Sequence, residues 1–209
     1  MKIGIDFDNT IVCYDGLFHR VAVENGFVAG DTPVSKGHVR DAMRRAGMEE
    51  QWIWLQGLVY GSRMVEAEPF EGVHAFFRRA RSLGIDLFIV SHKTRHPFRG
   101  PAYDLHEAAR NWLDTQGFHA VDGIALPPER AFFELTKTEK LQRIGALGCT
   151  HFVDDLPEFL AEPGFPGGVH RLLFDPAGHA HPETGFERVA SWAELSDRLL
   201  PCVAATGTR

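Results

Sequence analysis

The sequence predicts an α/β fold in which a Rossmann-like parallel sheet is flanked by helices and carries a small helical insertion. Short apolar runs typical of buried strands alternate with segments whose apolar residues recur at helical spacing. The clearest of these runs end in polar residues, as expected where parallel strands open onto a site. Several helical segments, separated by glycine and proline, follow the first strand and indicate the insertion.

The first half of the chain contains the start of the sheet and the whole insertion. A strand is expected at residues 3–7, directly before the polar Asp8-Asn9-Thr10. Helices are expected at 17–25, 36–46 and 49–60, with breakers between them. The length of 209 residues favours one main domain with room for an insertion. We therefore predict an α/β core at 1–13 and 66–209 and a helical insertion at 14–65.

The second half of the chain predicts the alternation of strands and helices that completes the sheet. Thr136 and Glu139 have the spacing of a capping box and predict a helix start. The expected helices are 73–82, 104–116, 136–146 and 191–200, and the expected strands are 85–90, 121–126, 150–153 and 169–174.

The charge balance argues against polyanionic partners. The chain has 22 basic and 28 acidic residues, a formal net charge of -6, so neither nucleic acid nor an anionic membrane is an expected partner. Lys93, Arg95 and Arg99 form a local basic cluster in the sequence that suits a small phosphorylated substrate. No signal peptide or membrane-length apolar stretch is apparent, which favours a cytoplasmic protein.

The strand ends carry the side chains that phosphate ester chemistry requires. Asp6 and Asp8 lie two positions apart, so one can attack phosphorus while the other transfers protons. Asp6 with Asp154 and Asp155, which follow the strand at 150–153, supplies the oxygen ligands that Mg²⁺ prefers. The sequence thus predicts a catalytic pair and a magnesium site at one edge of the sheet.

Further polar residues are candidates for binding the phosphate. Thr10 and Ser91 offer hydroxyl groups. His92 follows Ser91 and could contact the substrate, although exposed loops often carry such residues only for solubility. Lys137 precedes a predicted helix and is the expected fixed positive charge, and Lys140, which is close by, could serve instead.

Taken in order, these clusters resemble the four motifs of the haloacid dehalogenase superfamily. Asp6-Phe7-Asp8-Asn9-Thr10 is similar to the first motif, Ser91 to the second, Lys137 to the third and Asp154-Asp155 to the fourth. The resemblance implies an aspartyl-phosphate at Asp6, an acid and base at Asp8, and phosphate binding by Ser91 and Lys137. It also implies Mg²⁺, with the Asp8 main-chain carbonyl as a further ligand, and identifies the insertion as a C1-type cap.

The expected activity is therefore magnesium-dependent hydrolysis of a small phosphorylated metabolite. The carboxylate of Asp8 favours phosphate chemistry, because superfamily members that cleave carbon–halogen bonds lack a carboxylate at that position. Two alternatives stay open: a phosphotransferase or phosphomutase with the same active-site residues, and a non-catalytic module that binds a phosphorylated ligand. The sequence leaves the substrate and the oligomeric state undetermined.

Overall fold

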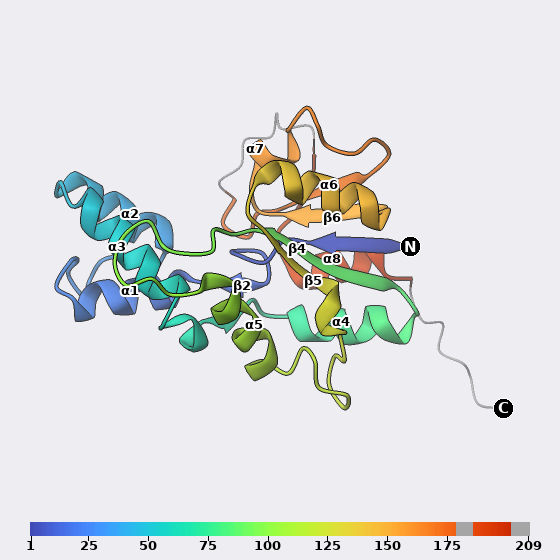
Figure 1. Cartoon of the computed structure of the whole chain (residues 1–209), viewed down its shortest axis with the longest axis horizontal. Coiled ribbons are helices and arrows are strands. Elements are labelled where there is room, and N and C mark those ends of the chain that lie inside the picture. Colours follow the sequence, from blue (N-terminus) through green and yellow to red (C-terminus); the bar gives the residue numbers. More distant parts are fainter. Residues whose placement is uncertain (179–185, 202–209) are drawn as a thin grey trace.

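A six-stranded, fully parallel sheet forms the centre of the molecule (Figure 1). The computed structural model describes residues 1–178 and 186–201. The strand order across the sheet is β5-β4-β1-β6-β7-β8. The strands are β1 (Lys2–Ile5), β4 (Asp86–His92), β5 (Ala131–Glu134), β6 (His151–Asp154), β7 (His170–Phe174) and β8 (Glu187–Val189). The predicted α/β class with a parallel sheet is confirmed.

Helices cover both faces of this sheet, with α6 and α7 on one side and α4 and α5 on the other (Figure 1). Their bounds are α4 (Val73–Ser82), α5 (Leu105–Thr115), α6 (Lys137–Leu147), α7 (Pro157–Leu160) and α8 (Trp192–Leu199). Alternate residues of β4 face opposite sides, since Leu87 and Ile89 belong to one apolar cluster and Phe88 and Val90 to the other. Burial on both faces explains why the strand reads as a continuous apolar run.

The helical insertion comprises α1 (Asp15–Glu24), α2 (Lys36–Arg45) and α3 (Glu49–Tyr60), and it projects beyond one end of the sheet (Figure 1). The chain enters it through β2 (Val12–Cys13) and leaves it through the short helix η1 (Met64–Glu66) and β3 (Glu68–Pro69). The strands β2 and β3 pair antiparallel. The insertion is therefore closed at its base by a two-stranded ribbon.

The insertion packs onto the same apolar core as one face of the sheet. Within it, the Phe18 and Trp52 rings lie 5.1 Å apart. The connection from β4 to α5 runs along α3, where a Cβ atom on Gly57 would lie 2.8 Å from both the Arg99 carbonyl oxygen and Pro97. Only glycine permits this close approach. The connection that follows Ser91 is thus fixed against the insertion.

The structure confirms most of the predicted elements and corrects one. The helices predicted at 49–60 and 73–82 are observed with the same bounds, and the predicted capping box of Thr136 and Glu139 is formed. Residues 121–126 are not a strand: Val121 is 90% exposed and Ala125 has a positive φ. One edge of the sheet is instead formed by β5, which follows the short helix η2 (Pro128–Arg130). Neither β5 nor β8, at the opposite edge, had been predicted. No helix among the described residues has the length and apolar character to cross a membrane.

Candidate active site

The parallel register of β1 and β6 brings three carboxylates together. Ile5 pairs with Val153, and the Asp6 backbone N–H donates to the Val153 carbonyl at 2.9 Å, so Asp6 emerges beside Asp154. Carboxylate oxygens of Asp6, Asp154 and Asp155 all lie within 4.8 Å of one another. The structure therefore brings together three of the four residues expected as magnesium ligands.

Lys140 bridges two of these carboxylates. Its Nζ atom lies 2.6 Å from Asp6 Oδ1 and 2.6 Å from Asp154 Oδ2. The ammonium is buried and lies 4.1 Å from the centre of the Phe159 ring. The other oxygen of Asp154 accepts a hydrogen bond from the Leu156 backbone N–H at 2.9 Å. Asp154 therefore turns the chain into α7 and also belongs to the carboxylate cluster.

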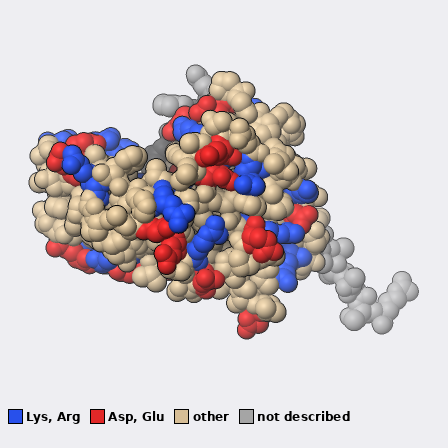
Figure 2. Space-filling view, viewed as in Figure 1, with Lys and Arg blue, Asp and Glu red and all other residues tan. Residues whose placement is uncertain are grey.

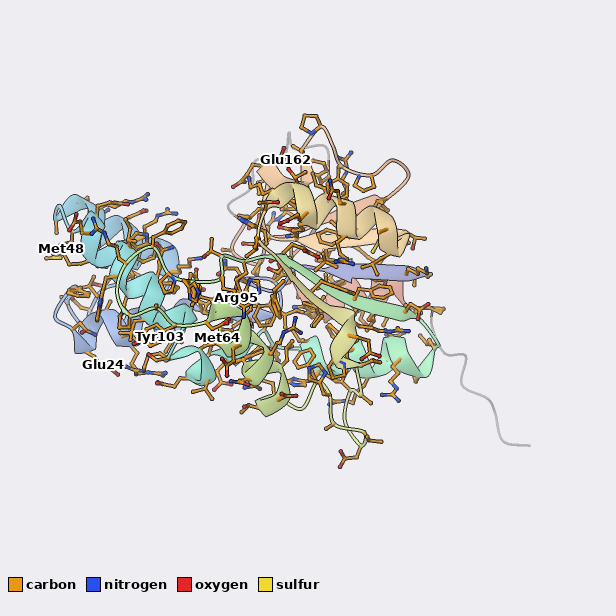
Figure 3. The ribbon with its side chains drawn as sticks, viewed as in Figure 1. Glu24, Met48, Met64, Arg95, Tyr103 and Glu162 are labelled. Atoms are coloured by element: carbon orange, nitrogen blue, oxygen red, sulfur yellow. The ribbon has the colours of Figure 1, made fainter. Side chains whose placement is uncertain are left out.

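The expectation that Lys137 would lie beside the nucleophile is corrected by this arrangement. Lys137 is exposed and its Nζ lies 3.6 Å from Glu162 Oε1, on the α7 side of the molecule where Figure 3 labels Glu162. Lys137 is the first residue of α6, whereas Lys140 and Ile144 are its buried residues. Lys140 and Ile144 are four residues apart, so both lie on the inner face of the helix. This spacing was the feature of the sequence that favoured Lys140 over Lys137.

The carboxylate cluster has unusual protonation properties. Burial raises the pKa of Asp6 to about 7, with Asp154 and Asp8 adding to the effect and Lys140 opposing it. Burial and the charges of Asp154 and Asp6 also hold the pKa of Asp155 well above its usual range. Three carboxylates balanced by one ammonium leave an excess of negative charge, which a divalent cation would offset.

Asp8 lies outside this cluster and has its own cation. Lys93 Nζ is 2.9 Å from Asp8 Oδ1 and 2.8 Å from Oδ2, and the Tyr14 hydroxyl donates to Oδ1 at 2.6 Å. Burial alone would raise the pKa of Asp8, but the Lys93 charge and hydrogen bonds outweigh it and leave the pKa below its ordinary value. The Asp8 side chain is therefore ionised and is not part of the three-carboxylate group.

The basic residues after Ser91 do not form one anion site. Lys93 pairs with Asp8, Arg95 with Asp104 at 2.7 Å, and Arg99 with Glu50 at 3.1 Å. Figure 3 labels Arg95 near the junction of the insertion and the sheet. Sequence reasoning missed the Lys93–Asp8 pair. Strand alternation could have indicated it, because residues two positions apart in a strand face the same side. Ser91 and Lys93 are both buried, and His92 between them is exposed.

Two hydroxyl groups lie buried nearby, one in the loop after β1 and one near the carboxyl end of β4. Thr10 is fully buried and its carbonyl oxygen accepts from Trp192 Nε1 at 3.1 Å. Among the described residues, no group hydrogen-bonds the Thr10 Oγ1 atom. Ser91 is also buried. An unsatisfied buried hydroxyl is rare in proteins, so the Thr10 hydroxyl can bind a ligand oxygen or a water molecule.

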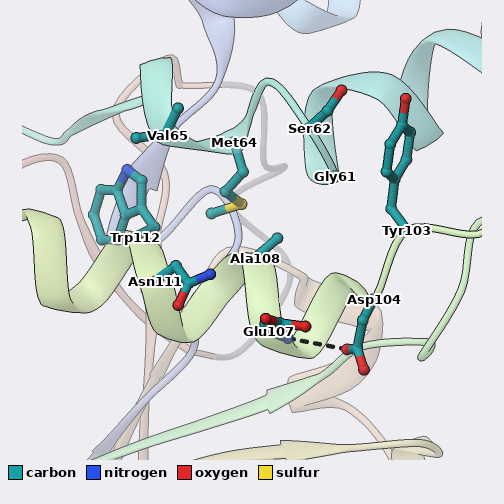
Figure 4. Close-up of a pocket in the computed structure, with 10 residues that line it drawn as sticks. All are labelled: Gly61, Ser62, Met64, Val65, Tyr103, Asp104, Glu107, Ala108, Asn111 and Trp112. Atoms are coloured by element: carbon teal, nitrogen blue, oxygen red, sulfur yellow. Dashed lines mark hydrogen bonds between the residues drawn. The ribbon is translucent and has the colours of Figure 1, made fainter.

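A pocket of about 270 Å³ lies between η1 and α5, and Met64 is one of its lining residues (Figure 4). The Met64 sulfur lies 3.3 Å from the hydroxyl oxygen of Tyr14, whose proton is donated to Asp8. Neither Asp6, Asp154 nor Asp155 lines this pocket. It is therefore distinct from the carboxylate cluster.

No sequence-family model matches the chain, and no curated protein matches it by sequence. Solved structures do match over nearly its whole length. One is a HAD family hydrolase from Deinococcus radiodurans R1 with bound phosphate and sodium, with a TM-score of 0.53, 17% identity and coverage of 95% of this chain and 94% of that one. Another is a dehalogenase with an intermediate complex, with a TM-score of 0.60, 14% identity and coverage of 96% and 97%.

The chain has the haloacid dehalogenase fold. A phosphoserine phosphohydrolase-like protein from Francisella tularensis subsp. tularensis SCHU S4 shares it, with a TM-score of 0.51, 15% identity and coverage of 96% of this chain and 100% of that one. Proteins with the haloacid dehalogenase fold thus include both phosphohydrolase-like proteins and dehalogenases. The chemistry of this chain has to be argued from its own site.

Proposed function

We propose that this chain is a magnesium-dependent phosphohydrolase that acts on a small phosphorylated metabolite through an aspartyl-phosphate at Asp6. The observation that carries the proposal is the cluster of Asp6, Asp154 and Asp155 joined by Lys140, with the ionised Asp8 two residues beyond Asp6. A nucleophile, a cation site and a proton-transferring carboxylate are the three elements that phosphate ester hydrolysis requires.

The donor set fits magnesium. Asp6, Asp154 and Asp155 offer only oxygen atoms, and two of these residues are buried. Hard cations prefer oxygen ligands, and Mg²⁺ needs few from the protein because it keeps several waters. When bound, the ion would neutralise the phosphate and the surrounding carboxylates. The main-chain carbonyl of Asp8 is a further candidate ligand in this proposal.

Asp6 acts as the nucleophile. One of its oxygens attacks phosphorus, the bond from phosphorus to the leaving oxygen breaks, and the electron pair of that bond stays with the leaving oxygen. Lys140 holds Asp6 Oδ1 and so orients the carboxylate. Water then attacks the aspartyl-phosphate, which releases phosphate and restores Asp6.

Asp8 transfers the protons of both steps. Because Asp8 is ionised before the substrate binds, it first takes up the proton that a phosphate monoester brings as its monoanion, and passes that proton to the leaving oxygen in the first step. In the second step Asp8 accepts a proton from the attacking water. Lys93 and Tyr14 each contact Asp8 directly, so they would orient it and set its protonation. Cleavage of a carbon–halogen bond needs no proton at the leaving group. The Asp8 carboxylate, which Lys93 and Tyr14 hold in place, is therefore the reason to favour a phosphate ester over a halogenated substrate.

Thr10, Ser91 and His92 are the proposed phosphate-binding groups, and the helical insertion is the proposed cap. The buried Thr10 hydroxyl supports a phosphoryl contact, because no described residue satisfies it. A small substrate is favoured, because the Asp6 and Asp8 side chains are only 8% and 21% exposed. Basic and acidic side chains are interspersed over the face in Figure 2, which agrees with a partner other than nucleic acid.

The test is phosphate release from a panel of phosphorylated metabolites, with magnesium and with chelator. Asp6→Asn should abolish release, and Asp31→Asn, a change at an exposed acidic residue of the insertion, should not. Phosphate that appears on an acceptor hydroxyl instead of in solution would favour a phosphotransferase. Tight binding of a phosphorylated compound without turnover would favour a binding module.

A further inference from the structure

Lys36 is a residue of the insertion whose charge lies close to the loop after β1. It is the first residue of α2, and its backbone N–H donates to Asp15 Oδ1 at 2.8 Å. The side chain of Ser35 caps the same helix. Two side chains therefore fix the start of α2 and with it the base of the Lys36 side chain.

The Lys36 ammonium lies where the insertion meets the sheet. Its Nζ is 5.6 Å from the ring centres of Phe18 and Tyr60, which come from α1 and α3. On the sheet side it lies 3.4 Å from Oδ1 of Asn9, the residue after Asp8. Tyr60 also has Lys93 Nζ 4.9 Å from its ring centre. Aromatic rings and a neutral amide thus hold this cation beside the loop that carries Asp8.

Lys36 differs from the other two lysines of the site in having no carboxylate partner. Lys140 contacts Asp6 and Asp154, and Lys93 contacts Asp8. Within the part of the chain that the structure describes, no ion pair involves Lys36, although Asp8 and Asp155 are near enough to act on its charge. A partly buried cation with only neutral contacts is suited to bind an anion from outside the protein.

We propose that Lys36 selects substrates whose leaving group carries a second anionic group, a carboxylate or a phosphate, in addition to the phosphate that is hydrolysed. This inference rests on the proposed phosphohydrolase function. The phosphoryl group under attack already has Lys140, which contacts Asp6, and the proposed contacts Thr10 and Ser91. Lys36 comes from the insertion instead, so its charge would face the part of the substrate that departs with the leaving oxygen.

The test compares matched substrates that differ only in this charge. 3-Phosphoglycerate carries a carboxylate where glycerol 3-phosphate carries a neutral hydroxymethyl group, and glycerol 1,3-bisphosphate supplies a second phosphate. Lys36→Met removes the charge and keeps an unbranched apolar chain between Phe18 and Tyr60. Lys36→Arg keeps the charge, and Arg45→Met removes a charge from the exposed far end of the same helix.

We expect the native protein to favour at least one of the two doubly charged substrates over glycerol 3-phosphate by about 10- to 100-fold in kcat/KM, as one charge-assisted contact allows. The identity of that substrate distinguishes a carboxylate from a phosphate. Lys36→Met should reduce the preference to about 1, with less than a threefold change for glycerol 3-phosphate. Lys36→Arg and Arg45→Met should keep the preference. Equal rates for all three substrates, or an equal loss for all in Lys36→Met, would overturn the proposal.

Binding measurements separate this inference from the hydrolase proposal. The same three compounds can be titrated by calorimetry, with magnesium, into Asp6→Asn and into Asp6→Asn combined with Lys36→Met. Charge-dependent binding that Lys36→Met abolishes, without phosphate release by the native protein, would support the role of Lys36 and refute the hydrolase. Phosphate release with no charge preference would support the hydrolase and refute the role of Lys36.

Discussion

The Lys93 ammonium lies within 2.9 Å of both carboxylate oxygens of Asp8, in the interior between β4 and the loop after β1. His106 holds the main chain of this lysine, because its Nε2 atom lies 2.7 Å from the Lys93 carbonyl oxygen. A bidentate, largely buried ion pair of this kind is costly to break, since the remaining charge keeps its desolvation cost. The pair therefore sets both the position and the protonation of Asp8.

Replacing Lys93 should change the pH dependence of turnover. Without the ammonium, the pKa of Asp8 rises, because Lys93 is what keeps it below the ordinary value despite burial. In Lys93→Met we expect the acidic limb of kcat/KM, which reports the ionised Asp8 of the free protein, to move to higher pH. The rate at neutral pH should also fall about 10- to 100-fold, because Asp8 loses the ion pair that positions it. Rate profiles from pH 5 to 9 at saturating magnesium measure both. Lys93→Arg should restore the position of the limb, and an unmoved limb in Lys93→Met would contradict the assignment.

Lys140 and Lys137 should behave very differently on mutation. Lys140→Met leaves Asp6 and Asp154 without their shared cation, so we expect activity to fall by about 10³-fold or more and the free energy of unfolding to drop by about 3–5 kcal/mol. Lys137→Met removes only an exposed contact with Glu162 and should change stability by less than about 0.5 kcal/mol. Phosphate release and urea denaturation test the pair, and similar effects of the two changes would contradict the structure.

The strand ends were predictable from sequence because each depends on local pattern. Asp6, Ser91 and Asp154 follow apolar runs, and parallel pairing brings such ends to one edge of the sheet. The role of Lys140 could not be predicted from local pattern alone, because lysines are generally exposed and this one lies on the buried face of a helix. Its burial depends on two carboxylates that are 134 and 14 positions away in the chain. A choice between Lys137 and Lys140 needed that tertiary information.

The misassigned edge strand has a similar cause. Residues 121–126 contain enough apolar residues to read as a strand, yet Val121 is exposed and the backbone there follows turns. The observed strand, β5, is only four residues long and pairs on a single side with β4. Short edge strands carry a weak periodic signal, so their pairing partner decides their structure.

Magnesium binding should release protons at neutral pH. The pKa values of Asp6 and Asp155 are raised, mainly by burial, so part of the metal-free protein carries a proton on this cluster at pH 7. Calorimetric titrations in two buffers of different ionisation enthalpy should show this release, and it should diminish at pH 8.5. Asp155→Asn should weaken magnesium binding by about tenfold or more, whereas Asp31→Asn should leave it unchanged. Equal heats in both buffers at pH 7 would refute the linkage.

The same carboxylates should make the metal-free protein less stable as the pH rises. Asp6 has a folded-state pKa of about 7 against an ordinary value of 3.8. Between these values the folded state keeps a proton that the unfolded chain loses, so the contribution of Asp6 is most favourable below about pH 4 and is lost as the pH rises through 7. We expect the Tm of the native protein, relative to that of Asp6→Asn, to fall between pH 5 and pH 8 in chelator.

Magnesium should reverse this trend, because a bound divalent cation compensates the ionised Asp6 that destabilises the metal-free fold. The difference in Tm between native protein and Asp6→Asn therefore should change sign, favouring Asp6→Asn in chelator at pH 8 and the native protein with magnesium. Thermal denaturation of both proteins across this pH range measures the difference directly. Parallel Tm curves in chelator would show that Asp6 ionises normally in the folded protein, and the electrostatic account of the cluster would then be wrong.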